Sequence, residues 1–128
     1  MDEPVIIPAL DNTEAGVNLN SAIGSSFIIH EWRGSGPPYL HVHHEDDEAW
    51  HVIEGKLTFK FHNRTVTVTK GTTVFVPAGT PHTYLADTSA RYLIILTPRL
   101  DKLISELQSS PINAHKEIMK KYASEILD

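Results

Sequence analysis

The sequence predicts one mainly β domain, a sandwich or a barrel, that ends in a short helical segment. Short stretches of apolar or alternating residues, separated by tight turns, fill residues 25–97. After Pro98 the spacing of apolar residues changes to a helical period. A chain of 128 residues is long enough for one domain with its own core, so a second domain is not expected.

The expected strands follow one another between residues 25 and 97. Leu57, Phe59 and Phe61 alternate with polar residues, which is the period of a half-buried strand. Val66 and Val68 alternate with threonines, so the valines are expected to face inward. Glycine and proline mark the turns. The expected strands are 25–33, 39–43, 48–53, 56–62, 64–69, 72–76, 81–86 and 90–97.

The two ends of the chain are expected to differ from this β region. Residues 1–24 mix Pro, Asp, Asn and Gly and are expected to form an extended arm, with a short strand near 17–20. Beyond Pro98 one apolar helix face is formed by Leu100, Leu103, Ile104 and Leu107. Residues 112–127 are expected to form a second helix. We expect the segment 98–128 to pack on the β domain or on the partner in a dimer.

Composition excludes several classes of function. The chain has no cysteine, which excludes disulfides, thiolate metal sites and a cysteine nucleophile and fits a cytoplasmic location. A net charge of -5 without a basic stripe argues against nucleic acid as a partner. The apolar runs are too short for a membrane span, and the first residues lack the basic region of a signal peptide. The unusual feature is the number of histidines, which is eight.

Four of the residues have the types and spacing of a metal site. His41 and His43 are two positions apart, which on a strand places both imidazoles on one face about 7 Å apart. Glu48 opens the next strand, and His82 lies on a later one that can face the pair if the sheet closes. A histidine pair alone is weak evidence, and the run from Glu45 to Glu48 alone is typical of a solvated loop. The context of the cluster therefore decides its meaning.

Two motifs with fixed spacing supply that context. The first comprises His41, His43, Glu48 and Gly55, with Gly34 and Gly36 each one residue away from the place of a leading glycine. The second comprises Gly71, Pro77, Gly79 and His82, with Ala86 where the motif has asparagine. Together they resemble the motifs of the cupin superfamily. The acidic run before Glu48 is similar to that of the small quercetin-dioxygenase-like cupins, and the resemblance covers roughly residues 25–97.

The resemblance implies a small antiparallel jelly-roll barrel with one divalent transition metal in its mouth. The implied ligands are His41, His43, Glu48 and His82. Such a set suits iron, nickel, manganese, cobalt, copper or zinc, so it does not choose among them. Asp46 and Asp47 are conceivable substitutes for the carboxylate, but the motif spacing favours Glu48.

Other side chains are assigned by strand parity. Tyr84 and Trp50 are expected to point into the same cavity as the ligands and, with Phe75, to contact a substrate; simple packing is the alternative for each. Phe59, Phe61 and Phe75 are expected to fill the barrel. His44 and His51 are expected to point away from the site. Ordinary surface or interface positions are expected for His30, His62 and His115.

The resemblance favours a quercetinase-like dioxygenase that acts on a flavonol or an enediol-type small molecule, with Glu48 as general base. A non-oxidative metal isomerase or lyase and a small-molecule-binding cupin without turnover stay open as alternatives. We also expect a homodimer, because the stretch 92–96 is apolar on both strand faces and the helices add apolar surface.

Overall fold

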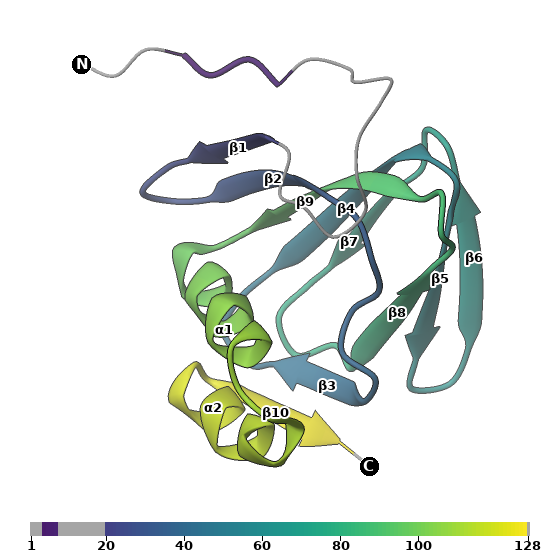
Figure 1. Ribbon diagram of the computed structural model, residues 1–128. Coiled ribbons are helices and arrows are strands. Elements are labelled where there is room, and N and C mark those ends of the chain that lie inside the picture. Colours follow the sequence, from purple (N-terminus) through teal and green to yellow (C-terminus); the bar gives the residue numbers. More distant parts are fainter. Residues whose placement is uncertain (1–3, 8–19, 128) are drawn as a thin grey trace.

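Two antiparallel sheets form the body of the computed structural model, which describes residues 4–7 and 20–127 (Figure 1). The first sheet has the order β1 (Asn20–Ile23), β2 (Ile28–Trp32), β9 (Arg91–Leu96), β4 (Glu48–Glu54) and β7 (Thr73–Val76). The second has the order β10 (Ser124–Leu127), β3 (Leu40–His43), β8 (His82–Ala86), β5 (Lys56–Phe61) and β6 (Thr65–Thr69). The predicted jelly-roll fold is confirmed. Among the described residues, however, no strand ladder joins the two sheets, so they do not form a closed barrel.

The core lies between the inner faces of the two sheets. Trp50 on β4 and Phe59 on β5 are fully buried, and their ring centroids lie 5.0 Å apart across the sheets. Val66 and Val68 are half-buried between exposed threonines, as the alternation predicts. Phe75 was expected to fill the core, and this is wrong. On β7 the neighbouring residues 74 and 76 take the inward positions, which leaves 61% of Phe75 exposed.

Tight turns hold the strands of the two sheets in place. Gly55 links β4 to β5 with φ of +79°, a conformation that other residues rarely adopt. A Cβ atom there would lie 2.7 Å from Cα of Ala90, so the turn also requires the absence of a side chain. The position of Gly55 at the end of the first motif thus has a steric cause.

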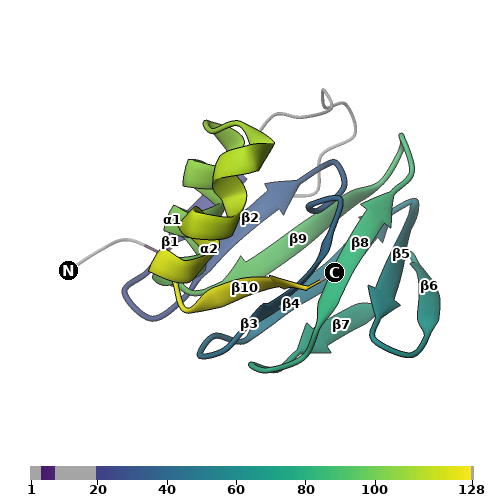
Figure 2. The same ribbon diagram turned by 90° about the horizontal axis from the view of Figure 1, so that it is seen from below.

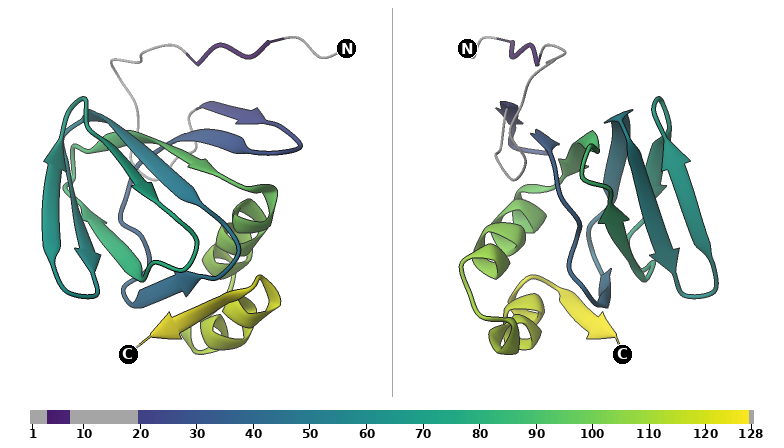
Figure 3. Two further views of the ribbon diagram at one scale, coloured as in Figure 1. Left: turned by 180° about the vertical axis from the view of Figure 1, so that it is seen from behind. Right: turned by 45° about the vertical axis from the view of Figure 1, so that its right-hand side comes forward.

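The C-terminal segment covers one side of the sheets. The helix α1 (Pro98–Gln108) begins at the Thr97 cap, whose hydroxyl accepts a hydrogen bond from the backbone N–H of Leu100 at 3.1 Å. Its buried residues are Leu100, Leu103 and Leu107, which join the core cluster. The turn η1 (Ile112–Ala114) leads into α2 (His115–Lys121). Figure 3 shows both helices on the side of the molecule away from β5 and β6.

The last part of the chain differs from the expected second helix. That helix ends at Lys121, and Ala123, with φ of +53°, turns the chain into β10. Strand β10 lies beside β3 (Figure 2). The two strands pair with Ser124 opposite His43 and Ile126 opposite His41. Pairing with the β3 edge therefore overrides the helical pattern of the isolated segment.

Two further expectations concern the N-terminal region and membranes. The short strand expected near 17–20 lies mostly outside the described residues, and β1 begins at Asn20. The structure of the described residues contains no helix that is long and apolar enough to cross a membrane.

Candidate metal centre

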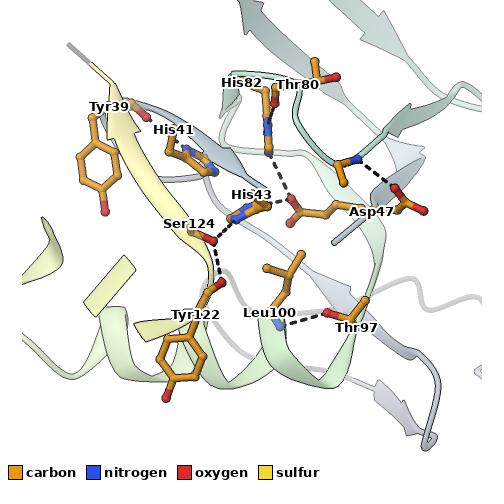
Figure 4. A network of polar contacts seen from close by, with 12 residues as sticks. Tyr39, His41, His43, Asp47, Thr80, His82, Thr97, Leu100, Tyr122 and Ser124 are labelled. Atoms are coloured by element: carbon orange, nitrogen blue, oxygen red, sulfur yellow. Dashed lines mark hydrogen bonds and ion pairs between the residues drawn. The ribbon is translucent and has the colours of Figure 1, made fainter. Parts of the chain in front are cut away.

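Three histidines from two strands of one sheet converge on one point. His41 and His43 lie on β3, and His82 lies opposite His41 on the paired strand β8. All three are buried, and one ring nitrogen of each lies within 4.8 Å of the corresponding nitrogens of the other two. Figure 4 shows the three rings turned toward one another. The period of two on β3 and the register with β8 produce this arrangement.

Each of the three imidazoles is held through its Nδ1 atom. His41 Nδ1 lies 3.3 Å from the backbone oxygen of Tyr39, and His82 Nδ1 lies 2.9 Å from that of Thr80. Because a carbonyl oxygen only accepts, both histidines carry their proton on Nδ1. This leaves the lone pair on Nε2 to face the centre of the cluster, as metal-binding histidines require.

The third imidazole is oriented by the C-terminal strand. His43 Nδ1 lies 2.7 Å from Ser124 Oγ, and that hydroxyl donates to the backbone oxygen of Tyr122 at 3.0 Å. Since the hydroxyl proton is used in this way, Ser124 Oγ accepts from His43 Nδ1. His43 is thereby fixed in the same tautomer as His41 and His82. Ser124 lies on β10, outside both sequence motifs, and the sequence analysis missed it.

Glu48 brings a carboxylate to the same centre from the facing sheet. Its Oε1 atom lies 3.1 Å from His82 Nε2 and 3.3 Å from His43 Nε2. Burial alone raises the pKa of Glu48, but the hydrogen bonds and positive charge of His43 and His82 outweigh burial and lower the pKa to about 2. The carboxylate is therefore ionised at neutral pH.

The donor set fits a cation. With a proton on Nδ1, His82 directs Nε2 at a carboxylate oxygen only 3.1 Å away. Two buried acceptors at this separation require a positive charge between them, which is either a proton or a metal ion. Burial and the neighbouring His82 and His43 lower the pKa of His41 to about 3, so His41 stays neutral and available as a ligand. Three imidazole nitrogens and one carboxylate suit a divalent transition metal.

The other histidines and carboxylates next to the cluster do not take part in it. His44 is exposed and contacts Glu125, and His51 contacts Thr73 on the outer face. Asp46 forms an ion pair with Arg99 at 3.1 Å. Asp47 is exposed and accepts from the backbone N–H of Ala78 at 2.9 Å. Neither aspartate joins the histidine cluster, which leaves Glu48 as its carboxylate.

The cluster opens into a cavity of about 480 Å³ between the sheets and α1. Trp50 and Tyr84 line it, as parity predicts, whereas Phe75 does not, because its side chain lies on the outer face. Tyr84 faces the cavity with its ring, against which Gly36 packs so closely that a Cβ would lie 2.7 Å from Cε1. The Tyr84 hydroxyl lies 2.8 Å from that of Tyr92, which donates to Gly34. Tyr84 therefore uses its own proton within the core.

The wall of this cavity also contains polar residues that parity arguments did not assign to it. His30 Nε2 lies 2.7 Å from Asp101 Oδ1, and His115 Nδ1 lies 2.8 Å from the Tyr39 hydroxyl. All four residues line the cavity. His30 and His115 were expected at ordinary surface or interface positions, and for His30, which is 8% exposed, this is wrong. The spacing of His30 with Ile28 and Trp32 on β2 was the available signal, since alternate residues share a face.

Comparison with known proteins agrees with this fold. The profile of the family described as "Cupin domain" matches residues 28–96. No curated protein matches the chain. A solved cupin-2 domain protein from Shewanella frigidimarina aligns with a TM-score of 0.56 and 22% identity over 66% of this chain and 82% of its own. A protein from Neisseria meningitidis aligns with a TM-score of 0.55 and 18% identity over 67% of this chain and 88% of its own. KdgF from Halomonas sp. aligns with a TM-score of 0.52 and 20% identity over 64% of this chain and 79% of its own. At these identities the similarity shows a shared fold.

Proposed function

Because the chain belongs to the cupin domain family, we propose that it is a metal-dependent dioxygenase, similar to the quercetin-dioxygenase-like cupins, that acts on a flavonol or enediol-type small molecule. The observation that carries the proposal is the opening of the histidine–carboxylate cluster into a largely apolar cavity of about 480 Å³. A flat molecule with one chelating polar edge fits a cavity of this size and character.

His41, His43, His82 and Glu48 would hold one ion of iron, nickel, manganese, cobalt, copper or zinc. Bound there, the metal supplies a Lewis acid that lowers the pKa of a chelating substrate hydroxyl and, if redox-active, permits reaction with dioxygen. The histidines keep their orientation through Tyr39, Thr80 and Ser124.

Glu48 is the residue placed to take the substrate's proton. Its low pKa keeps the carboxylate ionised, and its Oε1 atom is held between His43 and His82. Oε2 has no hydrogen bond among the described residues, so it is the atom that we propose accepts a proton from a hydroxyl of the bound substrate. Trp50 and the ring of Tyr84 cover this side of the cavity and limit the access of water.

The proposal is tested with an oxygen electrode. Protein is loaded separately with iron, nickel, manganese or cobalt and assayed with a panel of flavonols and enediols. We expect oxygen uptake with at least one metal and one member of the panel. No uptake with any metal, together with tight binding of a sugar or a keto acid, would favour a non-oxidative isomerase or lyase, or a binding cupin without turnover.

A homodimer and a cytoplasmic location are further proposals. The edge strand β1 carries Ile23, and the turn that follows carries Phe27; these side chains are 67% and 56% exposed. An apolar sheet edge of this kind supports pairing with a second copy. Sedimentation at micromolar concentration tests the dimer, and a uniform species at the monomer mass of 14.3 kDa would contradict it. The lack of cysteine supports the cytoplasm.

A further inference from the structure

The cavity has a second polar end, formed by His30 on β2 and Asp101 on α1. His30 Nδ1 lies 2.7 Å from Ser21 Oγ, and His30 Nε2 lies 2.7 Å from Asp101 Oδ1. Because a carboxylate only accepts, Nε2 carries the proton of this bond. His30 is buried, whereas the Asp101 side chain is 36% exposed. Asp101 Oδ2 has no hydrogen bond or ion pair among the described residues, so it can accept one from a ligand in the cavity.

Strand register places this pair away from the metal centre. His30 is opposite Ile94 on β9, and Ile94 is opposite Trp50 on β4, so the three residues form one row across the first sheet. The row spans two strand spacings, or roughly 10 Å between the backbones of β2 and β4. Trp50 contacts the ring of His82, with centroids 5.7 Å apart. One cavity is lined by the metal-side residues His82 and Trp50 and also by His30 and Asp101, so a ligand that starts at the metal can extend toward this pair.

The wall between the two polar ends is apolar. It includes Ile94 and Leu96 of β9 and Leu100, Leu103 and Leu107 of α1. Glu48 and Asp101 are the carboxylates that line the cavity, and within the described part of the chain no lysine or arginine lines it. A ligand with an anionic group at the Asp101 end would be repelled, whereas a neutral hydroxyl would find an acceptor.

We propose that His30 and Asp101 bind a neutral hydroxyl group at the end of the ligand remote from the metal. The substrate class is then a bifunctional molecule with a chelating oxygen at one end, an apolar and flat middle, and an uncharged hydroxyl at the other end. The ligand hydroxyl donates to Asp101 Oδ2, and His30 holds Asp101 in place through Oδ1. The inference rests on the metal site of the proposed function, but not on dioxygenase turnover.

The experiment uses zinc-loaded protein and three probes that differ only at the far end. The probes are 2-naphthohydroxamic acid, which chelates zinc, and its 6-hydroxy and 6-carboxy derivatives; affinities are measured by titration calorimetry. For the unmodified protein we expect the dissociation constant of the 6-hydroxy probe to be lower than that of the parent by a factor of about five or more, because this probe gains a hydrogen bond to a carboxylate. We expect the dissociation constant of the 6-carboxy probe to exceed that of the parent by a factor of about ten or more, because its carboxylate meets the carboxylate of Asp101.

Variants locate the effect at Asp101. Asp101→Asn removes the charge and keeps the shape of the side chain. In this variant the dissociation constants of the 6-carboxy probe and the parent should differ by about twofold or less. Asp101→Ala should abolish the preference for the 6-hydroxy probe and leave the parent probe within about twofold. Glu117→Gln removes an exposed negative charge from α2 and serves as the matched control, with the full discrimination retained.

The outcomes separate this inference from the proposed function. Equal affinities of the three probes for the unmodified protein would overturn the inference, and this comparison decides even if Asp101→Ala does not fold. Binding of none of the probes to protein that holds one zinc per chain would also overturn it, since the cavity would not admit a ligand along this row. Failure to hold zinc would contradict the metal site, and failure to consume oxygen would contradict only the dioxygenase proposal.

Discussion

The two ends of the cavity are built in different ways. At the metal end, His41, His43 and His82 lie on two paired strands, and Glu48 follows within the same motif. At the far end, His30 on β2 meets Asp101 on α1 from 71 positions away. Strand period and tight turns thus specify the metal end, whereas the far end exists only because the C-terminal helices fold back over the sheets. We propose that the first region sets the chemistry of the cavity and that the second sets its selectivity.

The largest effect is expected when one of the metal ligands is removed, because this change affects only the metal end of the cavity. For His82→Ala we expect metal content after dialysis to fall about tenfold or more from near one ion per chain, because one of the nitrogen ligands is lost. Metal analysis of protein purified without chelators and without a histidine-tag column measures this. His44→Ala is the control, since His44 is exposed and should leave metal content unchanged. Equal metal content in the two variants would refute the assignment of His82.

Replacement of the carboxylate tests the proton acceptor within the metal end. For Glu48→Gln we expect partial retention of metal and a fall in oxygen uptake by about 100-fold or more at equal metal loading, because the amide does not accept the substrate's proton. Initial rates are compared per bound metal ion. An unchanged rate per metal ion would show that Glu48 is not the base.

The third prediction tests whether the C-terminal segment also supports the metal end. Ser124→Ala removes the acceptor of His43 Nδ1, so we expect metal affinity to fall about 10- to 100-fold. Ser124→Thr keeps the hydroxyl and should restore most of the affinity. Competition with a metal-binding dye gives the dissociation constants.

The matched control for this variant is Ser109→Ala. Its hydroxyl also donates to a backbone carbonyl, that of Glu106, but it is exposed at the end of α1. We expect its metal affinity to equal that of the unmodified protein. If Ser124→Ala binds metal as tightly as Ser109→Ala, the role of Ser124 in orienting His43 is refuted.

The smallest expected effect is on the pH dependence of the stability of metal-free protein. Burial first, and then His82 and His43, lower the pKa of His41 to about 3 from the ordinary value of 6.5. Between these values the unfolded chain binds more protons than the folded chain, so the free energy of unfolding falls as pH falls below 6.5. One such group contributes at most about 1.4 kcal/mol per pH unit. Below pH 4.5 the lowered pKa of Glu48 adds a loss of the same sign.

Urea unfolding of chelator-treated protein between pH 7.5 and 4.5 measures this dependence. His41→Gln has no titrating imidazole at this position, so its stability should change less steeply with pH than that of the unmodified protein. Parallel pH profiles of the two proteins would show that His41 does not carry the effect.

The sequence could predict the metal end because its information is local. The spacing of His41 and His43, the place of Glu48 and the glycine turns follow from strand geometry, and the structure places these residues as expected. Parity also assigned Trp50 and Tyr84 to the cavity. The same rule failed for Phe75, because the choice of inward face on β7 depends on its pairing with β4.

The contacts that the C-terminal segment makes at both ends of the cavity could not be predicted, because long-range packing decides them. The segment 124–127 continues a helical pattern in isolation but pairs with the open edge of β3 in the fold. Ser124 acquires its partner His43 only through that pairing. Asp101 and His115 lie on helices whose apolar faces indicate that they pack, but not on which surface. Sequence periodicity therefore gives orientation within an element and leaves contacts between distant elements open.

The central claim is that three imidazoles and one carboxylate hold a single metal ion at the mouth of the cavity. X-ray absorption spectroscopy of protein loaded with one equivalent of zinc tests it most directly. The account predicts a first shell of nitrogen and oxygen at about 2.0 to 2.2 Å with the outer-shell scattering of three imidazoles. The spectrum of His44→Ala should be the same. A shell with one imidazole or none, or a spectrum that His82→Ala leaves unchanged, would contradict the account.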